Sequence, residues 1–528
     1  MKVLLLALAL PALSHCTDLD EVPWTSLSPD NFYKTPRDLE MAVNTVYGNM
    51  QAIGSSNAYN MILETLTEFN SPAYEKDDVH LWNAWIDVQN PDKGISIWTN
   101  AYRLINNANV VLGRGEGIEM DETLKKQYYG EVRFIRAWAY FHLVRIYGGA
   151  AIPESFTVGL SGLEIPRKSI QETYEYIIAD LEYAESVLPA KSGYDNDNVW
   201  RVSKGAAQGL LAKVYLTMGS MQESREYFQK CKEYCDKVIK SGEYALEEDF
   251  KDLWYWFNLD CKNGKESLFE IQYGNVSGET NGMHIQFGVN VTEPSLGSYM
   301  YRRMGPSIQH YLSYSDDDAR KEGSFLTEYT VTSTGERRWF DPIDNGFYPG
   351  GVGNWTTASP GVIKYYDRTA TSSSLNRPSA NVYVIRYADI LLSYAEAENQ
   401  LNGPTEDALA KFNAVRTRAG LEPLSGMTQQ QLDDYIYRER GWEFIGESLL
   451  YFDGIRTGRI GPNVKAHLEW SKQKEGKNSK GETITGIYMY TWEMGFKPTK
   501  NFLWKIPKGD LDSNPALEQN LDSEQGNY

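Results

Sequence analysis

The chain has 528 residues, with 71 acidic and 52 basic side chains and a formal net charge of -19. A chain of this length can bury a large core without disulfides or a structural metal, so one large domain is expected. The excess of negative charge disfavours contact with phosphate backbones, and we predict that the protein binds no nucleic acid.

The first residues resemble an export signal. Lys2 supplies a positive charge, and the apolar run Val3–Leu10 is too short to cross a bilayer. The next segment, Leu13-Ser14-His15-Cys16, resembles a lipobox, although His15 stands where a small residue is usual. We predict a signal peptide over 1–15, lipidation of Cys16 and a lipid-anchored tether over 16–34. The alternative is an ordinary signal peptide followed by an incidental Cys.

Helical periodicity prevails from residue 35 to residue 246. It is clearest over 131–147, where Phe134 and Trp138 lie four apart on one face, and Gly148-Gly149 ends the segment. Comparable helices are expected to begin near residues 101, 131, 170 and 204. Such separations, about 30 to 40 residues, are close to the period of tetratricopeptide-type helical pairs. We therefore predict a helical repeat scaffold over 35–246.

The character of the chain changes between residues 247 and 382. Breakers such as Pro349-Gly350-Gly351-Val352-Gly353-Asn354 remove helical periodicity. Long irregular stretches inside compact proteins are usually functional, so we predict the ligand-binding region here. Helices are then expected over Val384–Asn402, Thr405–Ala419 and Thr428–Gly446, followed by a tail from Asn501 that wraps the surface. We interpret 35–528 as a single domain, in which 383–528 forms the C-terminal helices and tail.

Several segments, in order along the chain, resemble one known family. They are Arg136-Ala137-Trp138-Ala139-Tyr140-Phe141, Ile385-Arg386-Tyr387-Ala388-Asp389, Asn413-Ala414-Val415-Arg416-Thr417-Arg418, Arg438-Glu439-Arg440 and the late Asn514-Pro515. None is decisive alone, but from the lipobox to the last residues they cover nearly the whole chain. The sequence resembles the SusD-like (RagB/SusD) family of outer-membrane nutrient-binding lipoproteins.

The resemblance implies a mostly α fold, in which a tetratricopeptide-like helical scaffold carries a loop-rich irregular half. It also implies a lipoprotein exposed at the surface of the outer membrane, beside a SusC-like TonB-dependent transporter. The expected nutrient is an oligo- or polysaccharide, with a peptide as the alternative. Charged residues three apart on helices, Arg386 with Asp389 and Arg440 with Glu443, are interpreted as scaffold contacts to each other or to nearby carbonyls.

Exposed aromatic rings are the candidate ligand-binding residues, because sugars stack their C–H faces on such rings. Two clusters lie outside the clearest helices. Their members are Trp82, Trp85, Tyr299, Tyr301, Trp339, Phe347, Tyr348 and Trp355. Trp98 shares a predicted helix face with Tyr102 and is expected in the core. For each loop ring, the alternative is that it anchors its loop to the scaffold.

Two other classes of protein are alternatives, a pure helical scaffold and a glycosidase. The scaffold would lack the aromatic platform, and the glycosidase would need two carboxylates facing across a cleft. Asp316-Asp317-Asp318, Asp341 and Asp344 offer acidic groups, but neighbouring acids in polar loops are usually solvated. Cys231 and Cys235 share a predicted helix without a nearby His. With no recognisable catalytic motif, we predict no enzyme activity, no cofactor and no metal.

Overall fold

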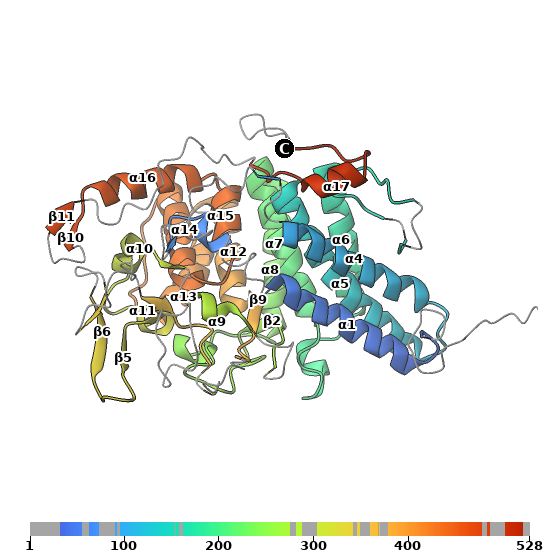
Figure 1. The fold of residues 1–528 in the computed structure, drawn as a ribbon, viewed down its shortest axis with the longest axis horizontal. Coiled ribbons are helices and arrows are strands. Elements are labelled where there is room, and N and C mark those ends of the chain that lie inside the picture. Colours follow the sequence, from blue (N-terminus) through green and yellow to red (C-terminus); the bar gives the residue numbers. More distant parts are fainter. Residues whose placement is uncertain are drawn as a thin grey trace, which may run out of the picture.

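The computed structural model describes most of the chain after residue 31. The described residues are 32–54, 63–72, 90–91, 95–153, 155–157, 162–274, 281–287, 304–341, 346–348, 360–367, 369, 378–477, 483–485 and 502–520. The predicted signal peptide, Cys16 and most of the tether lie outside them. The fold is mostly α-helical, as predicted, and the long helices stand side by side in one half of the molecule (Figure 1).

Six long helices form the helical half. They are α1 (Pro36–Gly54), α4 (Ile95–Arg114), α5 (Glu122–Tyr147), α6 (Ile170–Val187), α7 (Lys204–Gln222) and α8 (Arg225–Ser241). From α4 onward, each packs on the next in chain order, and α1 packs on α4. α6 and α7 begin at the predicted residues because Ser169 and Ser203 cap them. α4 and α5 begin earlier than predicted, α5 because Asp121 accepts from the Leu124 backbone N–H.

Helix α5 is the centre of the helical half. Its residues from Gly130 to Tyr147 are almost all buried, so this helix is apolar on nearly every side. One buried cation is held by rings: the Arg145 guanidinium lies 3.8 Å from the ring centroid of Phe141 and 3.6 Å from that of Phe452. Because Phe452 belongs to a late helix, this contact ties the helical half to the C-terminal part.

The helical stack continues in the C-terminal part of the chain. α12 (Tyr387–Asn402) packs on α8, and α13 (Glu406–Arg418) and α14 (Gln429–Phe444) pack on α12. Lys232 of α8 pairs with Glu398 of α12 at 2.7 Å. α15 (Leu450–Arg456), α16 (Ile460–Lys472) and α17 (Lys508–Ser513) follow. The predicted starts of α13 and α14 are confirmed, because Thr405 and Thr428 are their N-caps.

Short strands and short helices make up the other described elements, and most of them lie between α8 and α12. Every strand pair is antiparallel. The pairs are β1 (Asn70–Pro72) with β3 (Met304–Pro306), β2 (Ser267–Ile271) with β9 (Val382–Arg386), β4 (Phe325–Leu326) with β8 (Gly361–Val362), and β10 (Glu475–Lys477) with β11 (Thr483–Thr485). A three-stranded sheet comprises β5 (Glu328–Thr330), β6 (Arg337–Asp341) and β7 (Gly346–Tyr348). The short helices are η2 (Lys191–Gly193), η3 (Phe250–Leu253), α9 (Met283–Phe287), α10 (Ile308–Ser313) and α11 (Ala319–Ser324).

In the C-terminal part, the predicted start of one helix is wrong. We expected a helix over Val384–Asn402, but Val384 lies in β9 and the helix begins at Tyr387. The segment before the helix is rich in β-branched residues and pairs with β2, which lies more than 100 residues earlier. A partner so distant in sequence leaves no mark on the local periodicity.

A buried network of charges joins α14 to the rest of the C-terminal part. Arg386 pairs with Glu266 at 2.8 Å and with Glu447 at 2.9 Å, and both partners come from distant segments. Arg440 pairs with Asp389 and with Asp453, each at 2.7 Å. The role of these arginines as scaffold is therefore confirmed. The expected ion pairs with the acids three residues away are wrong, because both arginine side chains meet acids of other segments in the core.

The last described residues run back over the helical half, where α17 lies near α6 (Figure 1). The backbone N–H of Trp504 donates to the carbonyl of Ile146 at 2.8 Å, and Arg167 donates to Asn520 at 2.8 Å. The tail therefore covers the end of α5. The division of the chain at residues 246 and 382 stays a prediction.

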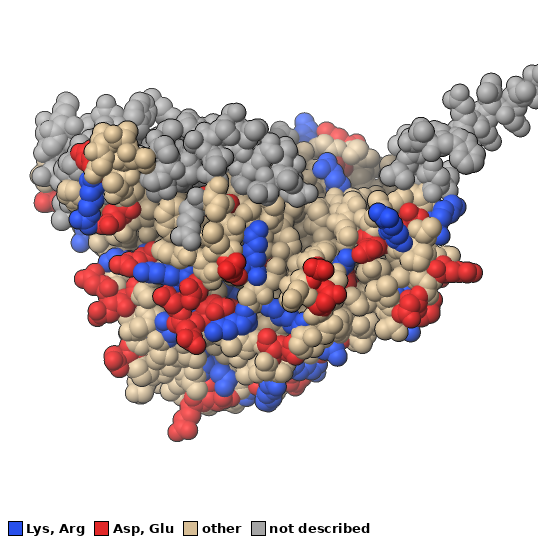
Figure 2. Space-filling view, turned by 90° about the horizontal axis from the view of Figure 1, so that it is seen from below, with Lys and Arg blue, Asp and Glu red and all other residues tan. Residues whose placement is uncertain are grey.

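The surface in Figure 2 carries acidic and basic side chains interspersed, with uncharged surface between them. On this face the negative charge of the chain is spread and not gathered into one area. Among the described residues, no helix is long and apolar enough to span a membrane.

Candidate functional site

A small sheet carries three of the predicted aromatic residues. In its register Trp339 lies opposite Tyr348, and Phe340 lies opposite Phe347. Trp339 is 42% exposed, unlike most large apolar residues of the described chain. Phe340 is buried against Tyr311 of α10, with ring centroids 5.4 Å apart. Because neighbouring residues of a strand face opposite sides, the sheet attaches to the protein through Phe340 and presents Trp339 to solvent.

The other aromatic candidates lie outside the described residues, but the strands next to them in sequence come together. The segment with Trp82 and Trp85 follows β1, and the segment with Tyr299 and Tyr301 precedes β3. Pro72, the last residue of β1, pairs with Met304, the first residue of β3. The first segment therefore leaves the β1–β3 strand pair at the same end at which the second segment enters it. The segment with Trp355 precedes β8, which packs on β3. The points where the three segments join the fold therefore converge, and the position of their rings stays a prediction.

The ring of Trp98 is core, as predicted. It is 3% exposed on α4, and its ring centroid lies 4.8 Å from that of Tyr102 and 5.1 Å from that of Tyr147. Trp254 is also buried, against Phe250 and Tyr383. These rings support the fold and take no part in the candidate site.

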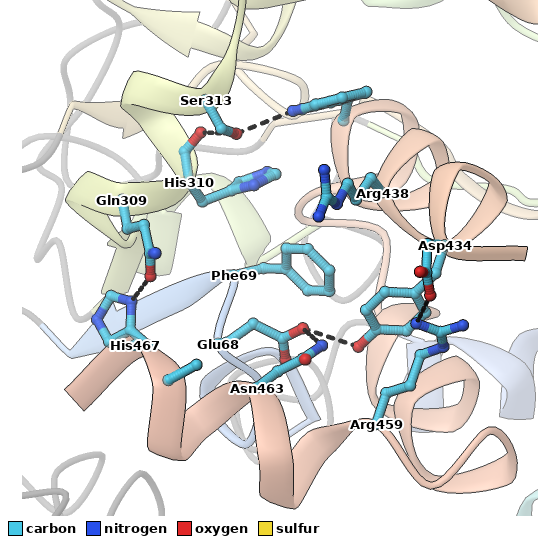
Figure 3. A pocket seen from close by; sticks show the side chains of 13 residues that line it. Glu68, Phe69, Gln309, His310, Ser313, Asp434, Arg438, Arg459, Asn463 and His467 are labelled. Atoms are coloured by element: carbon cyan, nitrogen blue, oxygen red, sulfur yellow. Dashed lines mark hydrogen bonds and ion pairs between the residues drawn. The ribbon is translucent and has the colours of Figure 1, made fainter. Parts of the chain in front are cut away.

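A cavity of about 570 Å³ opens between α10, α14 and α16 (Figure 3). Its polar lining comes from four segments. The residues include Glu68, His310, Asp434, Arg438, Arg459, Asn463 and His467. The Phe69 ring forms part of the wall and meets the His310 ring, with centroids 4.9 Å apart. Phe69 precedes β1, so the cavity lies at the end of the β1–β3 sheet opposite to the aromatic segments.

Glu68 is an acidic residue of the cavity lining and lies beside Asn463 in Figure 3. The hydroxyl of Tyr437 and the amide Nδ2 of Asn463 donate to its Oε1 at 2.9 and 2.7 Å. The other oxygen, Oε2, is buried and has no hydrogen-bond partner among the described residues. Burial raises the pKa of Glu68 to about 7, although both hydrogen bonds oppose this shift.

Two arginines and two histidines complete the electrostatics of the cavity. Arg459 is neutralised by Asp433 at 2.5 Å and Asp434 at 2.7 Å. Arg438 is exposed, and within the described chain no ion pair of its guanidinium is found. Burial lowers the pKa of His310 to about 3 and that of His467 to about 4, so both rings are neutral at pH 7.

The acidic residues considered for a glycosidase lie in different environments. Asp318 caps α11 and pairs with Arg320 at 2.8 Å, with both side chains buried. Asp316 is fully exposed and pairs with Lys321 at 2.9 Å. Asp341 belongs to β6, and Asp344 lies outside the described residues. Within the described part of the chain, no group of three or more His, Cys, Asp or Glu residues could hold a metal ion.

Comparison with known families decides what kind of protein this fold represents. A model described as the SusD family matches residues 265–522. A second model, described as starch-binding and associating with the outer membrane, matches residues 23–216. The chain belongs to the SusD-like family.

Relatives of this SusD-like protein resemble it over most of its length. SusD-like protein P2 of Formosa agariphila is 28% identical over 478 residues, which are 86% of this chain and 89% of the relative. Starch-binding protein SusD of Bacteroides thetaiotaomicron is 24% identical over 464 residues, 79% of this chain and 76% of the relative. Surface glycan-binding protein A of B. thetaiotaomicron, solved with laminarihexaose, has a TM-score of 0.71 and 19% identity, covering 92% of this chain and 100% of that one. This last likeness concerns the fold.

The sequence of this SusD-like chain did not point to the cavity. Its lining residues come from four segments between residue 68 and residue 467, and these segments do not form a common sequence motif. One signal was present, because the chain has six His and two of them, His310 and His467, meet at this cavity. Their convergence depends on the packing of α10 against α16, which local patterns do not encode.

Proposed function

We propose that this SusD-like protein captures an oligo- or polysaccharide at the surface of the outer membrane and passes it to a SusC-like TonB-dependent transporter. In this proposal Cys16 carries the lipid anchor. The observation that carries the proposal is Trp339, a large ring that is 42% exposed beside the buried Phe340 in the same strand. A flat exposed ring offers a sugar a large contact area at low side-chain entropy.

The relatives support glycan as the ligand class. Starch-binding protein SusD matches this chain over most of its length. The surface glycan-binding protein solved with laminarihexaose shares its fold. The other aromatic segments are connected to β1, β3 and β8, and these strands lie together. Such an arrangement is required if the rings are to form one platform. We propose that Trp82, Trp85, Tyr299, Tyr301, Trp339, Phe347, Tyr348 and Trp355 supply that platform.

The proposed role is binding without catalysis. Asp318, one of the acids available to a glycosidase, is committed to a buried ion pair with Arg320. A glycosidase general acid needs instead a carboxyl group that faces the scissile bond from a cleft. In the proposed role, chemical conversion of the glycan is left to other proteins.

A glycan array tests the proposal. Full-length protein purified in detergent is applied to arrayed oligo- and polysaccharides, and each glycan that binds is then incubated with the protein and its products are sized. We expect binding to at least one glycan and no change in its chain length. An array without any bound glycan contradicts the ligand class. New reducing ends that disappear when a single acidic residue is replaced contradict the non-catalytic role.

A further inference from the structure

The cavity between α10, α14 and α16 has the size and the lining of a small-molecule site. Its volume of about 570 Å³ lies in the range of such sites. The wall combines two aromatic residues, Phe69 and Trp442, with carboxylate, amide and guanidinium groups. Arg459 and Asp434 pair with each other, whereas Glu68 Oε2 is buried without a hydrogen bond and Arg438 has no ion pair within the described chain (Figure 3).

The buried Oε2 atom of Glu68 indicates what a ligand must bring. A buried carboxylate oxygen without a hydrogen bond costs free energy that a donor restores. Tyr437 and Asn463 already donate to Oε1, which holds the carboxyl group in one orientation. A ligand that reaches Oε2 from this cavity is therefore expected to donate a hydrogen bond to it.

The charges of the cavity indicate that the ligand is neutral overall. Two acidic groups, Glu68 and Asp434, and two basic groups, Arg438 and Arg459, line it, so the formal charges cancel when Glu68 is ionised. His310 and His467 add no charge at pH 7, because burial lowers both pKa values. A molecule with many hydroxyl groups can donate to Glu68 and accept from Arg438 without bringing a charge.

Position links the cavity to the aromatic candidates. Phe69 at the cavity is followed by β1, whose three residues span about 10 Å before the aromatic segment begins. On the other side, His310 of α10 lines the cavity while its neighbour Tyr311 packs on Phe340 of the sheet that presents Trp339. A chain of several sugar units could occupy both places at once.

We propose that this cavity is a second carbohydrate subsite, which holds one uncharged sugar unit through Glu68 and Arg438 while adjoining units of the same glycan contact the aromatic residues. The proposal rests on glycan binding as the function of the protein. Trp442 supplies a ring face to the sugar, and its Nε1 donates to Ser313 Oγ at 2.9 Å, which fixes the orientation of that ring.

The subsite has a characteristic pH dependence. Burial raises the pKa of Glu68 to about 7, and a sugar hydroxyl that donates to the ionised carboxylate binds better above that value. The charged or titratable groups around Glu68 are Tyr437, Asp434 and Arg438 of α14, Arg459 and His467 at α16, and His310 of α10. Tyr437 and the two histidines stay neutral between pH 6 and 8, because burial raises the pKa of the first and lowers those of the others.

The test compares variants of the full-length protein on one probe, the uncharged oligosaccharide of six or more units that binds most strongly on the glycan array. At pH 8 we expect Glu68→Gln and Arg438→Met each to weaken binding about tenfold, with the melting temperature unchanged in Arg438→Met and not lowered in Glu68→Gln. The matched control Arg225→Met removes an exposed arginine of α8 and should bind like the wild type. Wild-type affinity should rise several-fold from pH 6 to pH 8, and this rise should be absent in Glu68→Gln.

Different failures separate this proposal from the proposed function. If Trp339→Ala weakens binding while Glu68→Gln and Arg438→Met bind like the wild type, the subsite is overturned and glycan binding stands. If the array yields only acidic or amino sugars, the inference of a neutral ligand is overturned. If no glycan binds the wild type, both proposals fall together. Because Arg438 is exposed, its replacement tests the subsite even if Glu68→Gln destabilises the fold.

Discussion

Buried arginines govern the stability of the C-terminal part at the scale of single residues. Arg386 is 1% exposed and satisfies Glu266, Glu443 and Glu447 together. The pKa of Glu443 is held well below its usual range by Arg418 and Arg386, although burial alone would raise it. An ion cluster of this kind is sensitive to the removal of one member, because the remaining charges stay buried without compensation.

Replacing Arg386 tests this cluster. We expect Arg386→Met to lower the free energy of unfolding by about 3 to 5 kcal/mol, since it leaves three buried carboxylates short of a partner. Arg438→Met, which removes an exposed arginine from α14, should change stability by less than about 0.5 kcal/mol. Urea unfolding of both variants is the measurement. Equal stabilities of the two variants would contradict the role assigned to the cluster.

The partners of these arginines could not be predicted from sequence. Asp389 and Glu443 lie three residues from Arg386 and Arg440, and helical spacing makes such residues neighbours. In the structure Arg386 instead reaches Glu266 and Glu447, because it lies at the junction of β9 and α12, where the chain turns into the core. Local spacing indicates which arginines are expected to form ion pairs. Which carboxylates they pair with is determined by the tertiary fold.

At the scale of elements, the end of α5 shows how two glycines allow close packing. Gly148 has a φ of 81°, which ends the helix. At Gly149 an added Cβ would lie 1.9 Å from the carbonyl oxygen of Lys168, just before α6. The sequence predicted this helix end correctly, because a Gly-Gly pair followed by Pro153 is a strong local signal. The same local logic failed at β9, whose partner strand is distant.

Gly149→Ala tests the close approach of the α5 end to the segment before α6. We expect a loss of about 2 to 3 kcal/mol, because the clash is with backbone and cannot be relieved by a side-chain rotation. Gly117→Ala is the control, since no heavy atom lies within 4 Å of the position of its added Cβ. Thermal unfolding of the two variants decides the matter. If both glycines tolerate alanine equally, the segments are not packed as described.

At the scale of the whole molecule, one buried carboxyl group joins segments that are far apart in the chain. Glu64 is 1% exposed, accepts from Asn70 Nδ2 at 2.6 Å, and also accepts from the backbone N–H groups of Gly446 and Ser448. It thereby connects the start of β1 to the turn after α14. Burial raises its pKa to about 7 in spite of these bonds.

The pH dependence of stability follows from this shift. The folded pKa of Glu64 lies above the unfolded value, so its contribution to stability is full below about pH 4.5 and is lost as pH rises through about 7. Relative to the wild type, Glu64→Gln should therefore gain up to about 3 kcal/mol in stability between pH 5 and pH 8. Urea midpoints of both proteins at each pH measure this gain, and subtraction removes the opposite contributions of the buried histidines. Parallel curves would refute it.

The sequence predicted the architecture of the molecule better than its binding surface. Helical periodicity and family motifs cover nearly the whole chain, and both concern the scaffold, which the structure confirms. Exposure of Trp339 agrees with its predicted role, and that role stays a prediction. The cavity was missed because Glu68, His310 and Asn463 become neighbours only when α10, α14 and α16 pack around β1.

In the proposed function loop aromatics bind the glycan, and paired measurements of affinity and melting temperature test this claim. Trp82, Trp85, Trp339, Tyr348 and Trp355 are replaced one at a time by Ala, with Leu124→Ala on α5 as an exposed apolar control. Calorimetric titration uses the strongest glycan from the array. We predict unequal losses, with one or two variants costing about 2 kcal/mol or more and unchanged melting temperatures. Large losses of melting temperature with intact binding by the folded fraction would contradict the claim, because the rings would then be loop anchors.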